Sequence, residues 1–555
     1  MKMIENTPSN PNDISITMEP CPEGLEAAYN TLYSPDAIQF IAELVSTFDT
    51  RIEQLYWKRL KTKCTYQKLD QLPKFRNSPE RHEKHWKVAP LPQRLQNRHL
   101  DLGDVSPANT DHFKKALLAD VQGIQVDFDD GHCPTWKNQL IGLYNIFKVV
   151  HGQFSGIPSL STLPILMLRP RAWNMIEHNM MVNGKEVPGP LFDFGVLVFH
   201  NAHELFKEGS GPFFYLSKLE GADEAELWND IFVWAQQKLQ IPYGTIKACV
   251  LIENILSSFE MDEILYKLKD HSLGLNCGIW DYAASIISKF GHKKNFMLPD
   301  RNKYVNMSRH FLKSYMLLVI KTCHKRGAHA TGGMAAQSLS MENTSRNSEI
   351  IENVCKSKLQ EISAGVDGFM VYDIGLVPYI NKLWKQHAPE PNQLSVLPNE
   401  SVSPEDLLQM PTGGVTVNGM KHNVQVAILF IYYWFQGRGH FQFKGAVEDS
   451  ATAEISRSQI WQWIRHKASM EDVNGIVSKH LVSKFASEFI TECKKNNQFC
   501  NSIDDYQKII AAKEIFLELV TKREFPDFIT TFLNNNYIFW HFHKHSISSG
   551  PKCHL

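Results

Sequence analysis

The chain has 555 residues, of which 43% are hydrophobic and 21% are charged, so it can bury a large core and form more than one packed unit. Its formal net charge is −1, and no stripe of Lys and Arg interleaved with aromatic residues occurs, so we predict no nucleic-acid partner. The most apolar run of the C-terminal third, residues 424–435, is shorter than the roughly 20 residues of a membrane helix, so no membrane partner is predicted either.

The first part of the chain is expected to contain a polar tail and a helical clasp. Residues 1–20 are rich in Pro and Asn and lack the apolar core of a secretory signal, so we expect them to be disordered. Residues 21–115 show helical periodicity, most clearly from Pro35 to Val45, where Asp36 is placed to cap a helix. The ten cysteines have no CxxC-type spacing, which is typical of single thiols in a reducing compartment.

Residues 116–385 alternate short apolar runs with longer amphipathic ones, which is typical of repeated βα units. Eight units predict an α/β protein built on a TIM (β/α)8 barrel, although an open, doubly wound sheet would show the same pattern. The candidate strands are residues 124–128, 165–169, 213–216, 245–252, 274–276, 296–298, 329–331 and 368–372.

The C-terminal part is predicted to be a separate helical unit. Residues 386–412 are rich in Pro, Asn and Ser without periodicity, which indicates a linker. Residues 413–555 are mostly helical in pattern, with a buried helix over 424–435 and an amphipathic helix over 453–464. A glycine-bearing loop between these two helices carries Glu448 and Asp449.

Charged residues follow several predicted strands, at the barrel end where catalytic groups lie. Glu253 and Asp281 end neighbouring strands, so their oxygens can converge on one hard cation such as Mg²⁺, although a single acid at a strand end is more often a helix cap or surface ion pair. Arg169 ends an apolar strand, where a guanidinium must meet an anion or form a salt bridge with the aspartates after the first predicted strand. Arg171 is expected to point the same way as a helper.

The stretch from Lys269 to Tyr282 carries the most specific pattern. Glycines flank Asn276 and Cys277, and a glycine turn there exposes N–H groups that suit a small carboxylate. The string Asp-His-x-x-Gly-Leu-Asn-x-Gly-x-Trp-Asp-Tyr resembles the signature of the malate synthase family, in the short form without a large inserted domain. Collinear matches cover almost the entire chain and comprise residues 189–194, 209–216, 298–301, 320–328 and 448–457.

The resemblance implies an acyltransferase of the glyoxylate cycle, the bypass of the tricarboxylic acid cycle, that condenses acetyl-CoA with glyoxylate and hydrolyses the thioester to give (S)-malate and CoA with Mg²⁺. It places the general base on Asp449 and the arginine that stabilises the enolate on Arg169. Glu253 and Asp281 become the metal ligands. Backbone N–H groups from Gly278 to Asp281, including that of Trp280, would hold the glyoxylate carboxylate, and the C-terminal helical domain would cap the barrel mouth.

The chain also departs from the family pattern around the expected mouth. Glycine, histidine and arginine residues usual in the family are replaced, as is a small or cysteine residue at His440, and the positions concerned are Ala172, Asn174, Ile279, Val366, Asp373, Gln425 and His440. The open alternatives are a related acyl-CoA condensing or lyase enzyme that uses another 2-oxo acid, and a catalytically weakened acyl-CoA-binding protein. The final residues, Cys553-His554-Leu555, are similar to the address read by the peroxisomal import receptor, which favours a peroxisome or glyoxysome over the cytoplasm.

Overall fold

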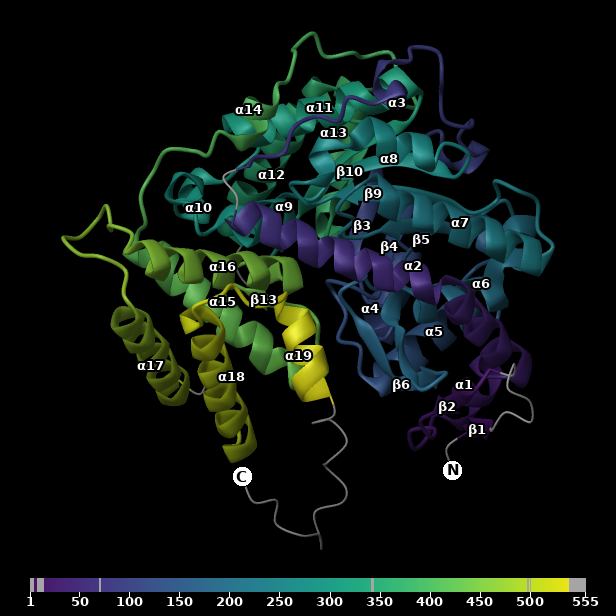
Figure 1. Ribbon diagram of the computed structural model, residues 1–555, viewed down its shortest axis with the longest axis horizontal. Coiled ribbons are helices and arrows are strands. Elements are labelled where there is room, and N and C mark those ends of the chain that lie inside the picture. Colours follow the sequence, from purple (N-terminus) through teal and green to yellow (C-terminus); the bar gives the residue numbers. More distant parts are fainter. Residues whose placement is uncertain are drawn as a thin grey trace, which may run out of the picture.

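The computed structural model describes residues 4–6, 14–68, 71–340, 344–496, 499 and 501–538. Among these residues, eight parallel strands close into a barrel, because the last strand pairs with the first through Phe369 and Leu100. The predicted TIM barrel is therefore confirmed (Figure 1). In barrel order the strands are β3 (Leu100–Val105), β4 (Gly123–Asp127), β5 (Ile165–Arg169), β8 (Phe213–Leu216), β9 (Lys247–Ile252), β10 (Ser272–Cys277), β11 (His329–Ala335) and β12 (Gly368–Val371).

Helices follow the strands and surround the barrel, so seven of the eight strands are buried at every residue. These helices are α4 (Thr110–Leu117), α5 (Trp136–Val150), α6 (Gly189–Lys207), α7 (Ala222–Leu239), α8 (Met261–Lys267), α9 (Ile279–Phe290), α11 (His310–Arg326), α12 (Thr344–Ala364) and α13 (Val377–His387).

One predicted strand is wrong and another was missed. Residues 296–298 follow a 3-10 turn, Lys294–Phe296, and bind the C-terminal domain: Trp463 Nε1 donates to the Leu298 carbonyl at 2.7 Å. The first barrel strand is instead β3, which lies inside the expected helical clasp, so the expected boundary at residue 116 is wrong. The strand was missed because it contains acids, which are unusual in a buried strand. Asp101 is nevertheless buried in the barrel, where the Tyr215 hydroxyl donates a hydrogen bond to it at 2.9 Å.

The N-terminal segment wraps the outside of the barrel. After α1 (Glu26–Leu32), the long helix α2 (Pro35–Lys68) crosses the molecule and packs on α6, α7 and α9 (Figure 1). The expected disorder of residues 1–20 is wrong for β1 (Ile4–Asn6) and β2 (Ile16–Met18), which extend an antiparallel sheet with β6 (Ile176–Val182) and β7 (Lys185–Pro188). Residues 1–3 and 7–13 lie outside the described residues.

The C-terminal helices form a second apolar core beside the barrel, seen as the green and yellow helices of Figure 1. They are α15 (Val417–Trp434), α16 (Ser450–His466), α17 (Lys479–Asn496), α18 (Ile503–Thr521) and α19 (Ile529–Tyr537). The expected loop between α15 and α16 contains a short hairpin, β13 (Phe441–Phe443) and β14 (Ala446–Glu448). Within the predicted linker, α14 (Pro404–Leu408) is the one helix that the described residues form.

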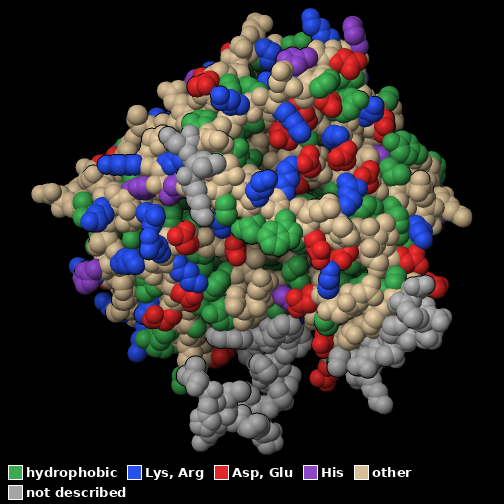
Figure 2. Space-filling view, in the orientation of Figure 1, with side chains coloured by type: hydrophobic (Ala, Val, Ile, Leu, Met, Phe, Trp, Pro, Cys, Tyr) green, Lys and Arg blue, Asp and Glu red, His purple; other side chains and the backbone are tan. Residues whose placement is uncertain are grey.

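Within the part of the chain that the structure describes, no helix combines the length and the apolar content needed to cross a membrane. On the face shown in Figure 2, basic and acidic side chains are interspersed. The terminal tripeptide Cys553-His554-Leu555 lies outside the described residues.

Candidate active site

A small cavity of about 80 Å³ lies at the C-terminal ends of the barrel strands, next to the first residues of α16. Arg169, Glu253, Asp281 and Asp449 all line it, and all four are buried. The structure therefore brings together the four side chains that the sequence marked, although they come from three barrel units and the C-terminal domain.

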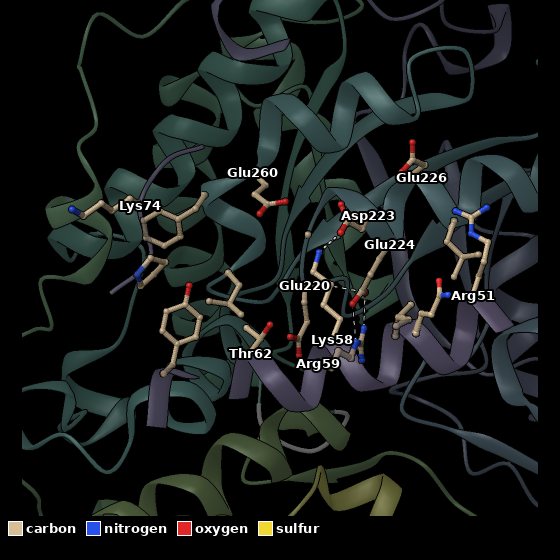
Figure 3. Close-up of a pocket in the computed structure, with 18 residues that line it drawn as sticks. Arg51, Lys58, Arg59, Thr62, Lys74, Glu220, Asp223, Glu224, Glu226 and Glu260 are labelled. Atoms are coloured by element: carbon tan, nitrogen blue, oxygen red, sulfur yellow. Dashed lines mark hydrogen bonds and ion pairs between the residues drawn. The ribbon is translucent and has the colours of Figure 1, made fainter. Parts of the chain in front are cut away.

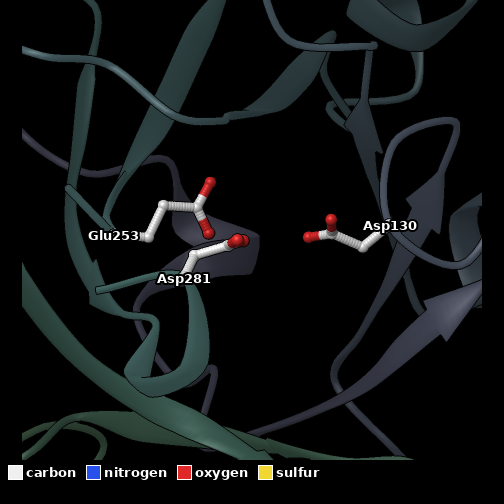
Figure 4. Close-up of side chains that lie close together, drawn as sticks. All are labelled: Asp130, Glu253 and Asp281. Carbon is white, nitrogen blue, oxygen red and sulfur yellow. The ribbon is translucent and has the colours of Figure 1, made fainter. Parts of the chain in front are cut away.

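Three carboxylates meet at this cavity: Asp130 after β4, Glu253 after β9, and Asp281 in the first turn of α9 (Figure 4). One oxygen from each lies within 4.8 Å of the others. Asp281 thus sits on a helix rather than at the end of a strand, but its strand, β10, pairs with β9 as expected. Asp281 Oδ1 is buried and has no hydrogen-bond partner among the described residues. A set of hard oxygen donors with one orphaned acceptor fits a Mg²⁺ ion.

The charge environment separates these three acids. Burial opposes the charge of Asp130, but the cations of Arg169 and Lys218 hold its pKa below its usual range. Burial raises the pKa of Glu253 to about 7, even though Lys218 and Arg169 oppose the rise. Burial likewise raises the pKa of Asp281 well above its usual range. The negative charge of Asp130 is therefore balanced by protein cations. The negative charges of Glu253 and Asp281 are balanced only in part.

Lys218, which the sequence reading missed, is the cation at the centre of this acidic group. Its Nζ lies 2.6 Å from Asp129 Oδ2, 2.8 Å from Asp130 Oδ1 and 3.3 Å from Asp281 Oδ2. Its own backbone N–H donates to Glu253 Oε1 at 2.7 Å. The residue was identifiable in principle, since a lysine two positions beyond the apolar strand β8 is placed at the catalytic end of the barrel.

Arg169 is held by carboxylates from the neighbouring β4 loop. Its guanidinium lies 3.4 Å from Asp127 and 3.4 Å from Asp129, and it forms a short ion pair with Asp130. Its Nε donates to Ser217 Oγ at 2.7 Å. Arg169 therefore makes the salt bridges with the aspartates of the β4 end that were one of its two expected roles, and its guanidinium also lines the cavity.

Arg171 does not act as a helper to Arg169. It binds Asp193 on α6 and Glu177 on β6, each at 2.8 Å. The prediction that both arginines point the same way is wrong, because the chain leaves the strand at Arg169 and turns away from the cavity.

The two glycines that flank Asn276 and Cys277 serve separate purposes, the first within β10 and the second just after it. Gly274 has φ +112, and an added Cβ would lie 1.9 Å from the His329 carbonyl oxygen, so glycine is required for the pairing of β10 with β11. The Gly278 N–H donates to the Tyr315 hydroxyl at 3.0 Å, so it is not free for a substrate. The N–H groups of Trp280 and Asp281 lie in the first turn of α9, where intrahelical acceptors are lacking, and they remain suited to an anion.

Asp449 is positioned by the C-terminal domain and by the barrel together. It is the N-cap of α16, and its Oδ1 accepts the Thr452 N–H at 2.9 Å while its own N–H donates to Thr452 Oγ1 at 2.9 Å. The preceding strand β14 is tied to the loop after β11, since the Val447 N–H donates to the Ala336 carbonyl at 2.8 Å. The following residue, Ser450, donates its hydroxyl to Asp130 in a short hydrogen bond.

The positions that depart from the family pattern mostly have structural partners. His440 Nδ1 lies 2.7 Å from the Gly131 carbonyl, and Lys444 donates to Gln425 at 2.9 Å. Asn174 donates to Thr531 at 2.8 Å. These contacts tie the barrel to the C-terminal domain or brace that domain, and they leave the four side chains at the cavity unchanged.

A larger cavity of about 540 Å³ lies between α2 and the barrel helices, away from the acidic cluster (Figure 3). Lys58 and Arg59 point from α2 toward Asp223 and Glu224, and they pair with them. Because these charges pair with one another, we interpret this cavity as part of the packing contact between α2 and the barrel helices. A third cavity, of about 380 Å³, shares Ile279, Trp280 and Thr452 with the catalytic cavity and adjoins it directly.

Family models match most of the chain. The model described as malate synthase, TIM barrel domain, matches residues 165–410, and the model described as malate synthase, C-terminal, matches residues 414–537. The barrel itself begins earlier, at β3, and the barrel model runs through the predicted linker.

Individual relatives agree with these matches. Malate synthase of Dictyostelium discoideum is 37% identical over 90% of this chain and 94% of its own length. The glyoxysomal malate synthase of Candida tropicalis is 36% identical over 90% of this chain and 92% of its own. The bifunctional glyoxylate cycle protein of Caenorhabditis elegans is 36% identical over 90% of this chain, which spans 52% of that longer protein. The chain belongs to the malate synthase family.

Proposed function

We propose that the protein condenses acetyl-CoA with glyoxylate and hydrolyses the resulting thioester, giving (S)-malate and free CoA. The observation that supports this most directly is the meeting of Arg169, Glu253, Asp281 and Asp449 at one cavity in a chain of the malate synthase family. The overall reaction balances with one water: acetyl-CoA, glyoxylate and water give malate and CoA.

Glu253 and Asp281 hold the Mg²⁺ ion in this proposal. Both are buried acids whose charge the protein compensates incompletely, and Asp281 Oδ1 lacks any other partner among the described residues. When bound, Mg²⁺ supplies Lewis-acid polarisation of the aldehyde oxygen of glyoxylate. The N–H groups of Trp280 and Asp281, at the start of α9, bind the glyoxylate carboxylate.

Asp449 acts as the general base that removes a proton from the acetyl methyl group. The acidity of a thioester methyl is weak, so the base must be held close and kept away from bulk water. The N-cap position on α16 provides this, because backbone and side-chain contacts with Thr452 leave Asp449 little freedom while its carboxylate lines the cavity.

Arg169 stabilises the enolate oxygen that forms when the proton leaves. A buried guanidinium held in place by Asp127, Asp129 and Asp130 needs no rearrangement when negative charge develops next to it. The enolate carbon then attacks the aldehyde carbon of glyoxylate. The cavity of about 80 Å³ suits a two-carbon acid, and the bulk of the acyl-CoA must lie in the spaces that adjoin it.

We further propose that the protein works in a peroxisome or glyoxysome and is imported through Cys553-His554-Leu555, with the cytoplasm as the alternative. The ending resembles the Ser-Lys-Leu type of address, and the Candida tropicalis relative carries the description glyoxysomal. Deleting the last three residues of a fluorescently tagged protein should move it from peroxisomes to the cytosol. An unchanged distribution would contradict the import proposal.

Release of free thiol tests the proposed reaction. Purified protein with acetyl-CoA, glyoxylate and Mg²⁺ should release CoA thiol and form malate in equal amounts. Asp449→Asn should lower kcat by at least about 10³-fold, because the amide cannot accept the methyl proton, while acetyl-CoA binding measured by calorimetry persists.

Asp472→Asn is the matched control, since Asp472 also accepts a backbone N–H, that of Val417, at the start of the C-terminal helix α15 but lies outside the cavity. It should leave turnover unchanged. Absence of thiol release from the wild-type protein would reject the reaction, and release with another 2-oxo acid but not glyoxylate would support the related condensing enzyme. An Asp449→Asn variant with full activity would reject the assignment of the base.

A further inference from the structure

Asp104 is a buried acid at the catalytic end of the barrel to which no role has been assigned so far. It is the second-last residue of β3, has φ +53 and is 3% exposed. It lines the same cavity as Asp449. Its backbone N–H donates to Gln125 Oε1 at 3.1 Å. Its side-chain Oδ2 is buried without a hydrogen-bond partner among the described residues.

The side chain of Asp104 faces other acids. It lines the same cavity as Asp449, so that their carboxyl groups can form a hydrogen bond when one of them is protonated, and Asp127 and Asp130 lie near it at the end of β4. Tyr372, after β12, is the neutral titratable group on its other side. Burial, followed by the negative charge of Asp449, raises the pKa of Asp104 well above its usual range.

Asp449 has a more mixed environment than Asp104. Its titratable neighbours include His440 and Glu448, and the cation of Arg301 also acts on it. Burial lowers the pKa of His440, so this imidazole is neutral at physiological pH. Because burial and the neighbouring carboxylates both oppose its charge, Asp104 is well suited to carry a proton.

We infer that Asp104 is protonated in the resting enzyme and donates its O–H to the Asp449 carboxylate, which makes it a positioning residue for the proton-abstracting base. The inference rests on the proposed function of Asp449. It accounts for the orphaned oxygen of Asp104, because two ionised carboxylates in contact offer acceptors alone, whereas a protonated carboxyl supplies the missing donor. With the Thr452 N–H on Oδ1, the added O–H gives the base a second fixed contact.

Two substitutions at Asp104 separate a hydrogen-bond donor from a mere filler of space. Asn and Gly both tolerate a positive φ, so neither should strain the turn after β3. Asp104→Asn replaces the carboxyl O–H by an amide N–H donor that cannot ionise. Asp104→Gly removes the donor altogether.

The expected result is that Asp104→Asn keeps kcat within about threefold of the wild type, whereas Asp104→Gly loses about tenfold or more, the value of a hydrogen bond to a charged group. KM for both substrates should change less than kcat. In the wild type, kcat should fall at alkaline pH as Asp104 ionises next to Asp449, and this alkaline fall should be absent in Asp104→Asn.

Asn183→Gly is the matched control, because Asn183 has φ +52 in the β6–β7 turn and does not line the cavity. It should keep the wild-type kcat and pH profile. Equal losses in Asp104→Asn and Asp104→Gly, or an Asp104→Gly variant with wild-type kcat and pH profile, would overturn the inference. If the wild type itself releases no thiol, the proposed function fails instead, and the two failures are thereby distinguished.

Discussion

At the scale of single residues, contact with the cations Lys218 and Arg169 decides in which direction the pKa of each buried acid at the cavity shifts. Asp130 and Glu253 both touch the same two cations, yet the pKa of Asp130 is lowered and that of Glu253 is raised to about 7. The difference follows from contact, because Asp130 lies within 2.8 Å of Lys218 Nζ while Glu253 lies at 4.0 Å. A bound divalent cation would supply the charge that Glu253 and Asp281 lack.

The metal proposal predicts the effect of removing either ligand. Glu253→Gln or Asp281→Asn should weaken Mg²⁺ binding by at least roughly 100-fold, because even the loss of an outer-sphere partner costs about 10- to 100-fold. Isothermal titration of the purified protein with Mg²⁺ measures this without any turnover.

Glu263→Gln provides the control for loss of a buried acid, since Glu263 lies on α8 and accepts the Ser78 hydroxyl in a short hydrogen bond. Its Mg²⁺ affinity should equal that of the wild type. Unchanged affinity in both ligand variants, with native circular dichroism, would remove Glu253 and Asp281 from the metal site.

At the scale of elements, α16 organises the active site because it contacts both cores. Its N-terminus carries Asp449, and its C-terminal half binds the segment that was mistaken for a barrel strand. Gln462 accepts the Leu298 N–H at 3.0 Å and donates to the Phe296 carbonyl at 2.9 Å. The helix therefore holds Asp449, the proposed base, at one end, while at the other end it satisfies buried backbone groups of residues 296 and 298.

Gln462→Leu should destabilise the protein by about 2–4 kcal/mol, because it leaves two buried backbone groups unpaired at roughly 1–2 kcal/mol each. Thermal and urea unfolding followed by fluorescence measure the loss. The control is Gln39→Leu on α2, where the side chain is exposed and bonds to Glu43 on the same helix. A Gln462→Leu variant as stable as the control would contradict the role of α16 as the clamp between the two cores.

At the scale of the whole molecule, several buried histidines make folding sensitive to acid. His271 lies at the start of β10, at the barrel end opposite the active site, and its Nδ1 is 2.9 Å from Asn229 Oδ1. Its Nε2 is 3.1 Å from the Gln236 amide nitrogen, so the ring is held neutral with one donor and one acceptor. Burial lowers the pKa of His271 to about 4.

A histidine whose pKa is lowered by folding binds a proton more readily in the unfolded chain than in the native state. Above the unfolded pKa of about 6.5 both states are neutral and the native state keeps its full stability; below that pH, protonation of the unfolded chain reduces this stability. At pH 5.5, His271 should cost about 1.4 kcal/mol of stability relative to pH 7.5. In His271→Gln, the fall in the free energy of urea unfolding between these two pH values should shrink by about that amount. An equal fall in wild type and variant would show that His271 does not contribute.

The sequence by itself determined most of the barrel and the identity of the catalytic candidates. Apolar runs between amphipathic stretches predict parallel βα units, because strands covered on both faces need no polar residues. The catalytic acids could be named because each directly follows such a run or lies in a distinctive glycine- or acid-rich motif. The resemblance then supplied their roles.

Only the tertiary structure decided which strand closes the barrel and which cation sits among the acids. The acids of β3 hide it from pattern reading, since their burial depends on partners such as Tyr215 that lie more than a hundred residues away. Lys218, and not Arg171, lies among these acids, because the direction of a side chain beyond a strand end depends on how the loop turns. Asp104 and Asp449, which line one cavity, come from the first barrel strand and from the C-terminal domain, so only folding brings them together.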